Sequence, residues 1–306
     1  MKIVLLAGGV GGAKLAEGLA RVLLPKELTI IVNTGDDFFH YGLKISPDLD
    51  TITYTLARLA NKKKGWGRSG DTFNMLNTLN ELGGETWFML GDKDLALHLE
   101  RTKLLKQGLT LTQVTKKFLY LLRINQSILP MSDNFIQTMV NTLEYGNLTF
   151  QEYFVVKHFS PQVRDFIFTG IDSATPAPGV FEAIHDADGI IISPSNPWVS
   201  IDPILMVPGI LSAITKKKSV AISPIISGSA MRGPAAKIFS EFGITPSAVA
   251  VYHHYHHFLT GFILDLIDKN LVNEIPIPVL VTKTIMNSLQ DRVKLAENVL
   301  DFMKYL

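Results

Sequence analysis

Runs of apolar residues alternate with helical patterns along most of the chain. KIVLLA at 2–7 is a continuous apolar run and predicts a buried strand, and the next segment, 13–24, has apolar residues at helical spacing. Similar runs predict strands at 28–33, 85–90, 189–193, 219–223 and 277–282, and helical patterns predict helices near 49–60 and over 286–304. Strands that alternate with helices predict a Rossmann-like α/β fold, with a doubly wound and mainly parallel sheet.

The segment 94–160 interrupts this alternation. It is rich in helix formers and has few apolar runs of the kind seen elsewhere, so we expect a largely helical insertion. No internal repeat, low-complexity segment or linker rich in Pro and Gly divides the chain. We therefore expect a single α/β domain over 1–306, with 94–160 inserted in it.

Composition narrows the function classes. The net charge of +1 and the short lysine runs argue against a nucleic-acid partner, because proteins that bind nucleic acids usually have a continuous stripe of basic residues. The absence of cysteine excludes disulfides and thiolate metal sites. The N-terminal apolar run is too short for a signal peptide, and no run approaches the roughly 20 residues of a membrane span. We expect a cytoplasmic protein without a membrane partner.

A glycine loop joins the first predicted strand to the first predicted helix. Gly8, Gly9, Gly11 and Gly12 lie there with Lys14, in a pattern that matches neither the dinucleotide fingerprint nor the Walker motif. Free N–H groups at a helix N-terminus still attract anions, and glycine lets an anion approach the backbone. The loop therefore predicts a phosphate site; the alternative is a tight strand–helix turn.

Four aspartates lie beyond the second predicted strand: Asp36, Asp37, Asp48 and Asp50. Ligands of doubly wound sheets bind at the carboxyl ends of strands. Asp48 is expected to cap the helix that begins at Leu49. Carboxylates beside a phosphate site predict Mg²⁺, which one or two carboxylates hold together with substrate phosphates, or a catalytic base. The alternative is a solvated loop.

Polar loops follow other predicted strands as well. They contain Asp92 after 85–90, then Ser193, Ser195 and Asn196, and then Ser227, Gly228, Ser229 and Arg232. Each loop alone is typical of helix capping or a structural turn, but their recurrence at strand ends predicts a common ligand crevice. HHYHH at 253–257 lacks the acidic partner of a zinc motif, which favours a surface or interface cluster over a metal site.

These motifs together resemble the 2-phospho-L-lactate transferase family. The resemblance covers nearly the whole chain and rests on GGVGGAKLAEGL, NTGDDFFHYGLKISPDLDT, RSGDTF, LGDKDLALHLERT, SPSNPWVSIDPIL and SPIISGSAMRGPAAK, in this order. It implies a Mg²⁺-dependent transfer of phospholactate from lactyl-2-diphospho-5'-guanosine to the hydroxyl of the deazaflavin Fo. The products would be F-420-0 and GMP, in coenzyme F-420 biosynthesis. Some relatives use the enolpyruvyl donor, and the sequence leaves that choice open.

The resemblance also implies roles for the candidate residues. Asp50 is expected to contact the Fo hydroxyl as the first catalytic candidate, and Asp48 is expected to share catalysis and, with Asp50, the metal. Further Fo contacts are implied for Met89, Asp36, Asp37 and Asp92. Donor contacts are implied for Gly9, Gly11, Gly12, Lys14, Ser193, Ser195, Asn196, Ser227, Gly228, Ser229 and Arg232.

Two other functions compete with the transferase. A related family of nucleotide-sugar-binding regulators has a similar glycine loop without catalysis, but its members differ from this chain where the aspartate-rich stretch 33–51 stands. A nicotinamide-dependent dehydrogenase is disfavoured because Lys14 breaks the dinucleotide fingerprint. We also expect a homodimer, since exposed apolar helices in such folds often form dimers.

Overall fold

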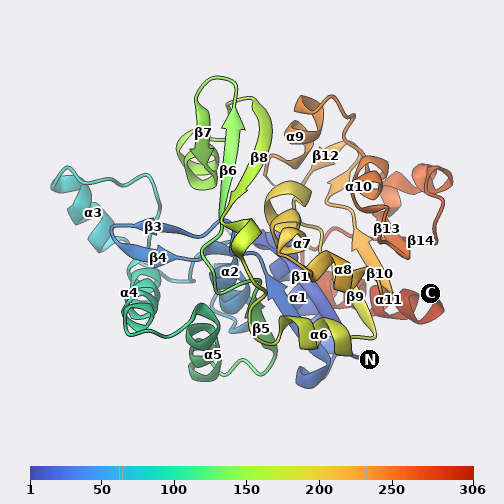
Figure 1. The fold of residues 1–306 in the computed structure, drawn as a ribbon, viewed down its shortest axis with the longest axis horizontal. Coiled ribbons are helices and arrows are strands. Elements are labelled where there is room, and N and C mark those ends of the chain that lie inside the picture. The colour runs from blue at the N-terminus through green and yellow to red at the C-terminus, as the bar shows by residue number, and fades with distance from the viewer. Residues whose placement is uncertain (62, 64, 232) are drawn as a thin grey trace.

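Seven parallel strands form the central sheet of the computed structural model, which describes residues 1–61, 63, 65–231 and 233–306 (Figure 1). Their order is β14-β13-β10-β9-β1-β2-β5. The strands are β1 (Ile3–Ala7), β2 (Leu28–Val32), β5 (Ser127–Pro130), β9 (Gly189–Ile192), β10 (Ser219–Ile222), β13 (Gly261–Asp265) and β14 (Val279–Thr282). The predicted Rossmann-like, doubly wound sheet is confirmed.

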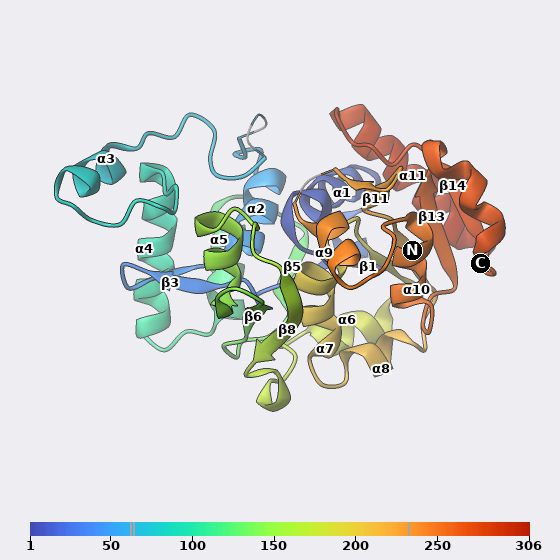
Figure 2. The same cartoon turned by 90° about the horizontal axis from the view of Figure 1, so that it is seen from above.

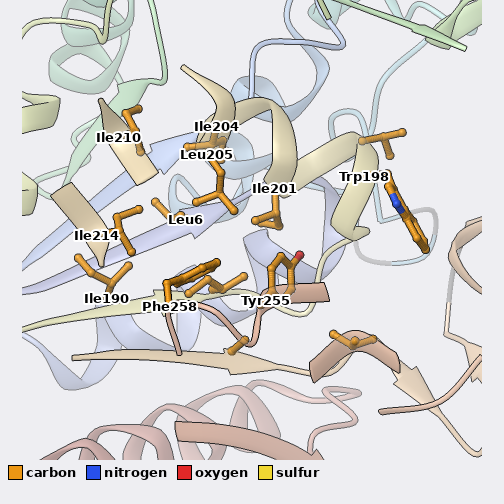
Figure 3. Packing of buried hydrophobic residues seen from close by; sticks show 14 of the residues in the cluster. Leu6, Ile190, Trp198, Ile201, Ile204, Leu205, Ile210, Ile214, Tyr255 and Phe258 are labelled. Atoms are coloured by element: carbon orange, nitrogen blue, oxygen red, sulfur yellow. The ribbon is translucent and has the colours of Figure 1, made fainter. Parts of the chain in front are cut away.

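Helices cover both faces of this sheet. Alternate side chains of β1 point to opposite faces: Ile3 and Leu5 belong to one hydrophobic cluster, and Val4 and Leu6 belong to the other. Figure 3 shows Leu6 and Ile190 packed beneath side chains of the second cluster. The first face carries α1 (Gly9–Val22), α2 (Pro47–Leu56), α5 (Leu111–Leu121) and α11 (Leu289–Tyr305); the second carries α6 (Val180–Asp186), α7 (Asp202–Met206), α8 (Ile210–Ile214), α9 (Ala235–Glu241) and α10 (Ala248–Tyr255).

Smaller elements extend from this core. The antiparallel sheet β7-β6-β8 stands above it, and both views place α3 (Asn74–Glu81) at the end away from α11 (Figures 1 and 2). The remaining strands are β3 (Phe38–His40), β4 (Leu43–Ile45), β6 (Gln137–Thr142), β7 (Gly146–Thr149), β8 (Val163–Thr169), β11 (Ile225–Ile226) and β12 (Ser229–Ala230), and α4 spans Asp92–Lys106. Short helical turns lie at Pro25–Glu27, Glu152–Val156, Ile171–Ser173, Pro197–Ile201 and Leu266–Glu274.

Two predictions from the sequence are wrong. The run 85–90 is not a strand: it is an irregular segment between α3 and α4, and the rings of Trp87 and Phe88 pack on Phe38 of the β3–β4 hairpin. The segment 94–160 is helical only in its first half, because β5 completes the central sheet and β6 and β7 belong to the antiparallel sheet. In β6, buried and half-buried residues alternate as a half-covered strand requires.

In the part of the chain that the structure describes, no helix combines the length and apolar character that a bilayer crossing requires.

Candidate active site

A cavity of about 1010 Å³ opens at the carboxyl ends of the central strands. Its walls include segments that follow β1, β9, β10 and β14, such as Gly8–Gly11 and Pro194–Asn196. The chain adds β2 and β5 on one side of β1, and then β9, β10, β13 and β14 on the other side. The sheet order therefore reverses between β1 and β9, and this switch point is where doubly wound sheets bind ligands.

The glycine loop forms one wall of the cavity. α1 begins at Gly9, and the N–H of Gly9 donates to Asp48 Oδ1 at 2.7 Å. The next N–H groups of a helix have no partner within the helix, and the first turn of α1 has no acidic residue. Lys14, also on the wall, donates from Nζ to the Met286 carbonyl at 2.7 Å. This wall is thus suited to a phosphate group.

The loop glycines have different structural roles. A Cβ on Gly11 would lie 2.4 Å from the Pro194 carbonyl oxygen, and one on Gly12 would lie 2.9 Å from Ala7 Cβ. Gly9 has a φ of +60°, and a Cβ there would meet nothing within 4 Å. Close packing against neighbouring residues therefore explains why glycine stands at positions 11 and 12. This agrees with the alternative that the loop is a tight strand–helix turn. Gly9 is the member of this group whose added methyl would project into open space.

This difference predicts unequal costs of substitution. We expect Gly11→Ala to lower the free energy of unfolding by about 3 kcal/mol, since a methyl group would overlap a backbone carbonyl. Gly9→Ala should cost only about 1 kcal/mol, from its left-handed backbone. Urea unfolding of both variants measures the two costs. Equal destabilisation would contradict the assigned packing.

Two of the four aspartates are paired with buried cations. Lys44 Nζ lies 3.2 Å from Asp37 Oδ2, which also accepts from Ser46 Oγ at 2.7 Å. Both carboxylate oxygens of Asp50 accept from Arg101, one of them from Nη1 at 3.0 Å. Arg101 and Asp50 are almost fully buried. Asp37 and Asp50 therefore each have a cationic partner within the protein, although burial raises the pKa of both carboxyl groups against the charges of Lys44 and Arg101.

Asp36 and Asp48 form the opposite case. Asp48 Oδ2 accepts from Asn33 Nδ2 at 3.0 Å, and Asp36 Oδ1 has no hydrogen-bond partner among the described residues. Burial raises the pKa of Asp48 to about 6. Burial, followed by the charge of Asp48, raises the pKa of Asp36 well above its ordinary value. Both residues line the cavity, so this is a carboxylate pair to which a bound cation would bring charge balance.

The capping role expected for Asp48 is wrong. α2 begins one residue earlier, at Pro47, with Ser46 at its N-cap position. The Asp48 carboxylate instead accepts from the backbone N–H of Gly9, at the start of α1. The two helix N-termini converge on the cavity, so a carboxylate in the first turn of α2 reaches the first turn of α1. Asp48 thus links the aspartate-rich segment to the glycine loop.

Clusters of three or more His, Cys, Asp or Glu that could hold a metal alone are absent from the described part of the chain. The pair Asp36 and Asp48 fits Mg²⁺ in the other common arrangement, in which substrate phosphates complete the coordination. The histidine cluster HHYHH at 253–257 is separate from this pair: His254 in it contacts Asp202, with 2.9 Å between His254 Nε2 and Asp202 Oδ1.

Aromatic side chains form the far walls of the cavity. Trp66, Trp87 and Phe88 line it from the segment before α4. Phe150, Phe154 and Phe159 line it from the segment after β7; Phe154 stacks on both others, with ring centroids 5.4 and 5.7 Å apart. Sequence reasoning missed these phenylalanines, although Phe150 and Phe154 have the i, i+4 spacing of a helical face. Such walls suit a flat aromatic ligand.

Comparison with known proteins identifies the family. Residues 3–303 match the model of the family described as 2-phospho-L-lactate transferase CofD. The chain belongs to this family. It is 39% identical to a 2-phospho-L-lactate transferase from Methanocaldococcus jannaschii, over 98% of this chain and 97% of that protein. It is 43% identical to a phosphoenolpyruvate transferase from Kitasatospora aureofaciens, over 89% of this chain and 87% of that protein.

The fold also resembles a solved structure at low sequence identity. A UPF0052-family protein from Bacillus halodurans superposes with a TM-score of 0.64 at 16% identity, covering 98% of both chains. This likeness supports the fold alone. Activity as a transferase rests on membership of the CofD family.

Not every predicted site residue of this CofD-family chain lies on the cavity wall. Gly9, Gly11, Lys14, Asp36, Asp48, Asp50, Met89, Ser195 and Asn196 line it. Gly12 and Asp37 lie behind the wall, as does Ser193, whose Oγ is 2.8 Å from Ser195 Oγ. Arg232 lies outside the described residues.

Asp92 and the 227–229 loop have structural partners instead of a place on the wall. Asp92 accepts from the N–H groups of Asn74 and Met75, and so caps α3. Ser227 and Gly228, with φ of +50° and +73°, form the two-residue turn between β11 and β12, ahead of Ser229. In the sequence this turn is Ser-Gly between the pairs Ile225–Ile226 and Ser229–Ala230. A ligand-binding loop has the same composition, so the sequence alone does not distinguish the two.

Proposed function

We propose that this CofD-family transferase moves a 2-phospholactyl group from lactyl-2-diphospho-5'-guanosine to the hydroxyl of the deazaflavin Fo. The hydroxyl oxygen attacks the phosphorus atom bonded to lactate, the bond from that phosphorus to the GMP oxygen breaks, and the hydroxyl proton is released. The products are F-420-0 and GMP. The supporting observation is that one cavity combines an anion-binding helix N-terminus, buried carboxylates and aromatic walls.

The donor would bind on the glycine-loop side. The first-turn N–H groups of α1 and the ammonium of Lys14 would neutralise its phosphate oxygens, and charge neutralisation with positioning accounts for most of phosphoryl-transfer catalysis. Asn196 supports a nucleotide beside them: its Oδ1 accepts from the N–H of Trp198, whereas its Nδ2 has no partner among the residues described. Asn196 lines the cavity, and this amide nitrogen is a buried donor that a small local movement would bring to a bound nucleotide.

We propose Mg²⁺ as the cofactor, held by Asp36 and Asp48. This differs from the Asp48–Asp50 pair expected from the sequence, because Arg101 occupies both oxygens of Asp50. Bound there, the ion would neutralise charge on the diphosphate. Asp50 then serves best as an orienting group for the Fo hydroxyl at the cavity wall, with Arg101 fixing its position.

The test is an assay with purified protein, Fo, Mg²⁺ and either the lactyl or the enolpyruvyl donor, following GMP and the mass of the coupled deazaflavin. Both donors are needed because relatives carry both names. We expect turnover with the lactyl donor. Turnover with the enolpyruvyl donor alone would reassign the donor, and guanosine diphosphate binding without turnover would favour the nucleotide-sugar-binding regulator.

Removal of the metal gives a separate prediction. Excess chelator should abolish turnover, because the donor phosphates and the Asp36–Asp48 pair would repel each other without a cation between them. Fo binding, followed by the fluorescence of its ring, should persist, and added Mg²⁺ should restore turnover. Full turnover in excess chelator would overturn the metal assignment.

We also propose a cytoplasmic homodimer. Leu99 of α4 and Tyr120 and Leu121 of α5 are more than half exposed, which is consistent with a surface that a second copy covers. Light scattering of the purified protein would measure its mass, and a monomer at micromolar concentration would contradict the dimer.

A further inference from the structure

One face of α4 carries three buried polar residues that lie against α2. Asp94, His98 and Arg101 are spaced i, i+4 and i+7, so they share one side of the helix, and each is at most 9% exposed. Two of them have partners on α2: Asp94 is hydrogen-bonded to the Tyr54 hydroxyl, and Arg101 donates to both oxygens of Asp50. His98 stands between these two pairs, and it lines the cavity.

Arg101 fixes the position of the proton on the His98 ring. Arg101 Nη1 lies 3.2 Å from His98 Nδ1, and Asp50 Oδ2 lies 3.6 Å from the same nitrogen. A guanidinium only donates hydrogen bonds, so Nδ1 accepts this one and cannot hold a proton. Burial, followed by the charge of Arg101, lowers the pKa of His98 well below its ordinary value, so the ring is neutral. The single ring proton is therefore on Nε2.

Nε2 is the ring nitrogen that remains available. The hydrogen bond and the ion-pair contact that His98 makes with described residues both involve Nδ1. The polar side-chain atoms that are enclosed and also lack a hydrogen bond belong to other residues of the described part of the chain. Nε2 therefore keeps accessible surface, and the space that His98 borders is the cavity. Its N–H group is a neutral donor that opens onto the cavity.

An acceptor stands beside this donor. Asp50 lines the same cavity, and its oxygens keep lone pairs after they accept from Arg101. A donor and an acceptor side by side match two neighbouring hydroxyl groups, one of which donates to Asp50 while the other accepts from His98. Phosphate oxygens fit less well, because the Asp50 carboxylate would repel them and the neutral ring supplies no positive charge. The two residues together thus fit a vicinal diol.

We infer that His98 is a specificity-determining residue that binds the sugar-alcohol chain of the acceptor. The hydroxyl that attacks phosphorus donates to Asp50, and the hydroxyl on the next carbon accepts from His98 Nε2–H. This inference rests on the proposed function, because Fo carries such a chain of hydroxyl groups on its ring. Since His98 donates to the neighbouring hydroxyl, the lone pairs of the attacking oxygen stay free for phosphorus.

The experiment compares Fo with an analogue that lacks only the hydroxyl next to the attacking one. Dissociation constants are measured by ring fluorescence on the full chain and on two variants, His98→Asn and His98→Gln. We expect the unaltered protein to bind Fo about tenfold more tightly than the analogue, which is the effect of one well-formed hydrogen bond.

The two variants differ in what they keep of the histidine ring. His98→Asn still offers Arg101 an acceptor oxygen but is too short to reach the ligand, so it should bind Fo and the analogue alike. His98→Gln places an amide N–H near the position of Nε2 and should retain a preference for Fo. Damage to packing at position 98 would weaken both ligands equally, whereas loss of the hydrogen bond weakens Fo alone.

Two matched controls make the same substitution at other histidines. His185 of α6 is exposed, and His254 of α10 is paired with Asp202. Neither residue lines the cavity, so His185→Asn and His254→Asn should both keep the tenfold preference for Fo.

The outcomes are separable. Equal affinity of the unaltered protein for Fo and its analogue would overturn the inference, and this comparison needs no variant to fold. An unchanged preference in His98→Asn would overturn it as well. Either result leaves the proposed function intact if Fo is turned over. An unaltered protein that neither binds nor couples Fo would overturn the proposed function and the inference with it.

Discussion

Asp50→Asn should lower the free energy of unfolding by about 3–5 kcal/mol, because it leaves the Arg101 guanidinium buried without its carboxylate. Breaking a buried ion pair costs more than the pair contributes, since the remaining charge stays out of water. Urea unfolding followed by circular dichroism measures the change. A rate measured in this variant would therefore mix a loss of folded protein with any loss of catalysis.

Two control substitutions on α4, the helix that carries Arg101, test whether the lost stability comes from the unpaired guanidinium. Adding Arg101→Met to Asp50→Asn removes the unpaired charge, so the double variant should regain part of the lost stability. Glu100→Gln breaks only exposed ion pairs with Lys103 and Lys117, and its unfolding midpoint should not change. Unaltered stability of Asp50→Asn would show that Asp50 is not paired with Arg101, and would return Asp50 to the candidates for a base.

The central sheet could be predicted where buried strands are continuous apolar runs bounded by turn residues, as β1 and β9 are. The run 85–90 has the same composition but is not a strand. Its rings pack against the β3–β4 hairpin and the cavity, and an apolar run does not show which apolar surface it covers. The strand β13 was not predicted, although its five residues are all buried, because its short apolar run continues past Asp265 into Leu266 and Ile267 and so has no clear end in the sequence.

The site was predictable where it depends on the ends of strands. Asp36 and Asp48 follow β2, the glycine loop follows β1, and the parallel sheet brings them together. Their partners were not predictable: Arg101 stands 51 residues beyond Asp50, on a helix whose docking on α2 and β4 no local pattern shows. Asp48 and Asp50 lie in one turn of α2 but differ in role, because only Asp50 is paired with a cation, and that cation is distant in the sequence.

Asp36→Asn should reduce turnover by about 100-fold or more while leaving the metal-free protein as stable as the unaltered chain, or more so. The carboxylate is buried beside Asp48, which raises its pKa, so its ionised form destabilises the fold at neutral pH. An amide of the same shape removes that cost and also removes a ligand for Mg²⁺. The loss of rate follows from the lost neutralisation of the diphosphate.

The pKa shift of Asp36 also predicts how the stability of the protein changes with pH. The pKa of Asp36 is higher in the folded chain than in the unfolded chain, where it is about 4, so the folded state binds more protons between these two values. The unaltered protein therefore loses stability as pH rises through that window. The stability gained by Asp36→Asn should be largest at neutral pH and vanish near pH 4, as urea unfolding in excess chelator would measure.

The neighbouring Asp37 provides the contrast. Burial raises the pKa of Asp37 as well, against the opposing charge of Lys44. Asp37→Asn should nevertheless destabilise the same metal-free protein at neutral pH, because it leaves the buried Lys44 ammonium without its carboxylate. Two adjacent buried aspartates are thus expected to respond with opposite signs, because Asp37 is paired with Lys44 whereas Asp36 has no ion pair among the described residues. Destabilisation by Asp36→Asn as large as by Asp37→Asn would contradict an open carboxylate pair and the metal assigned to it.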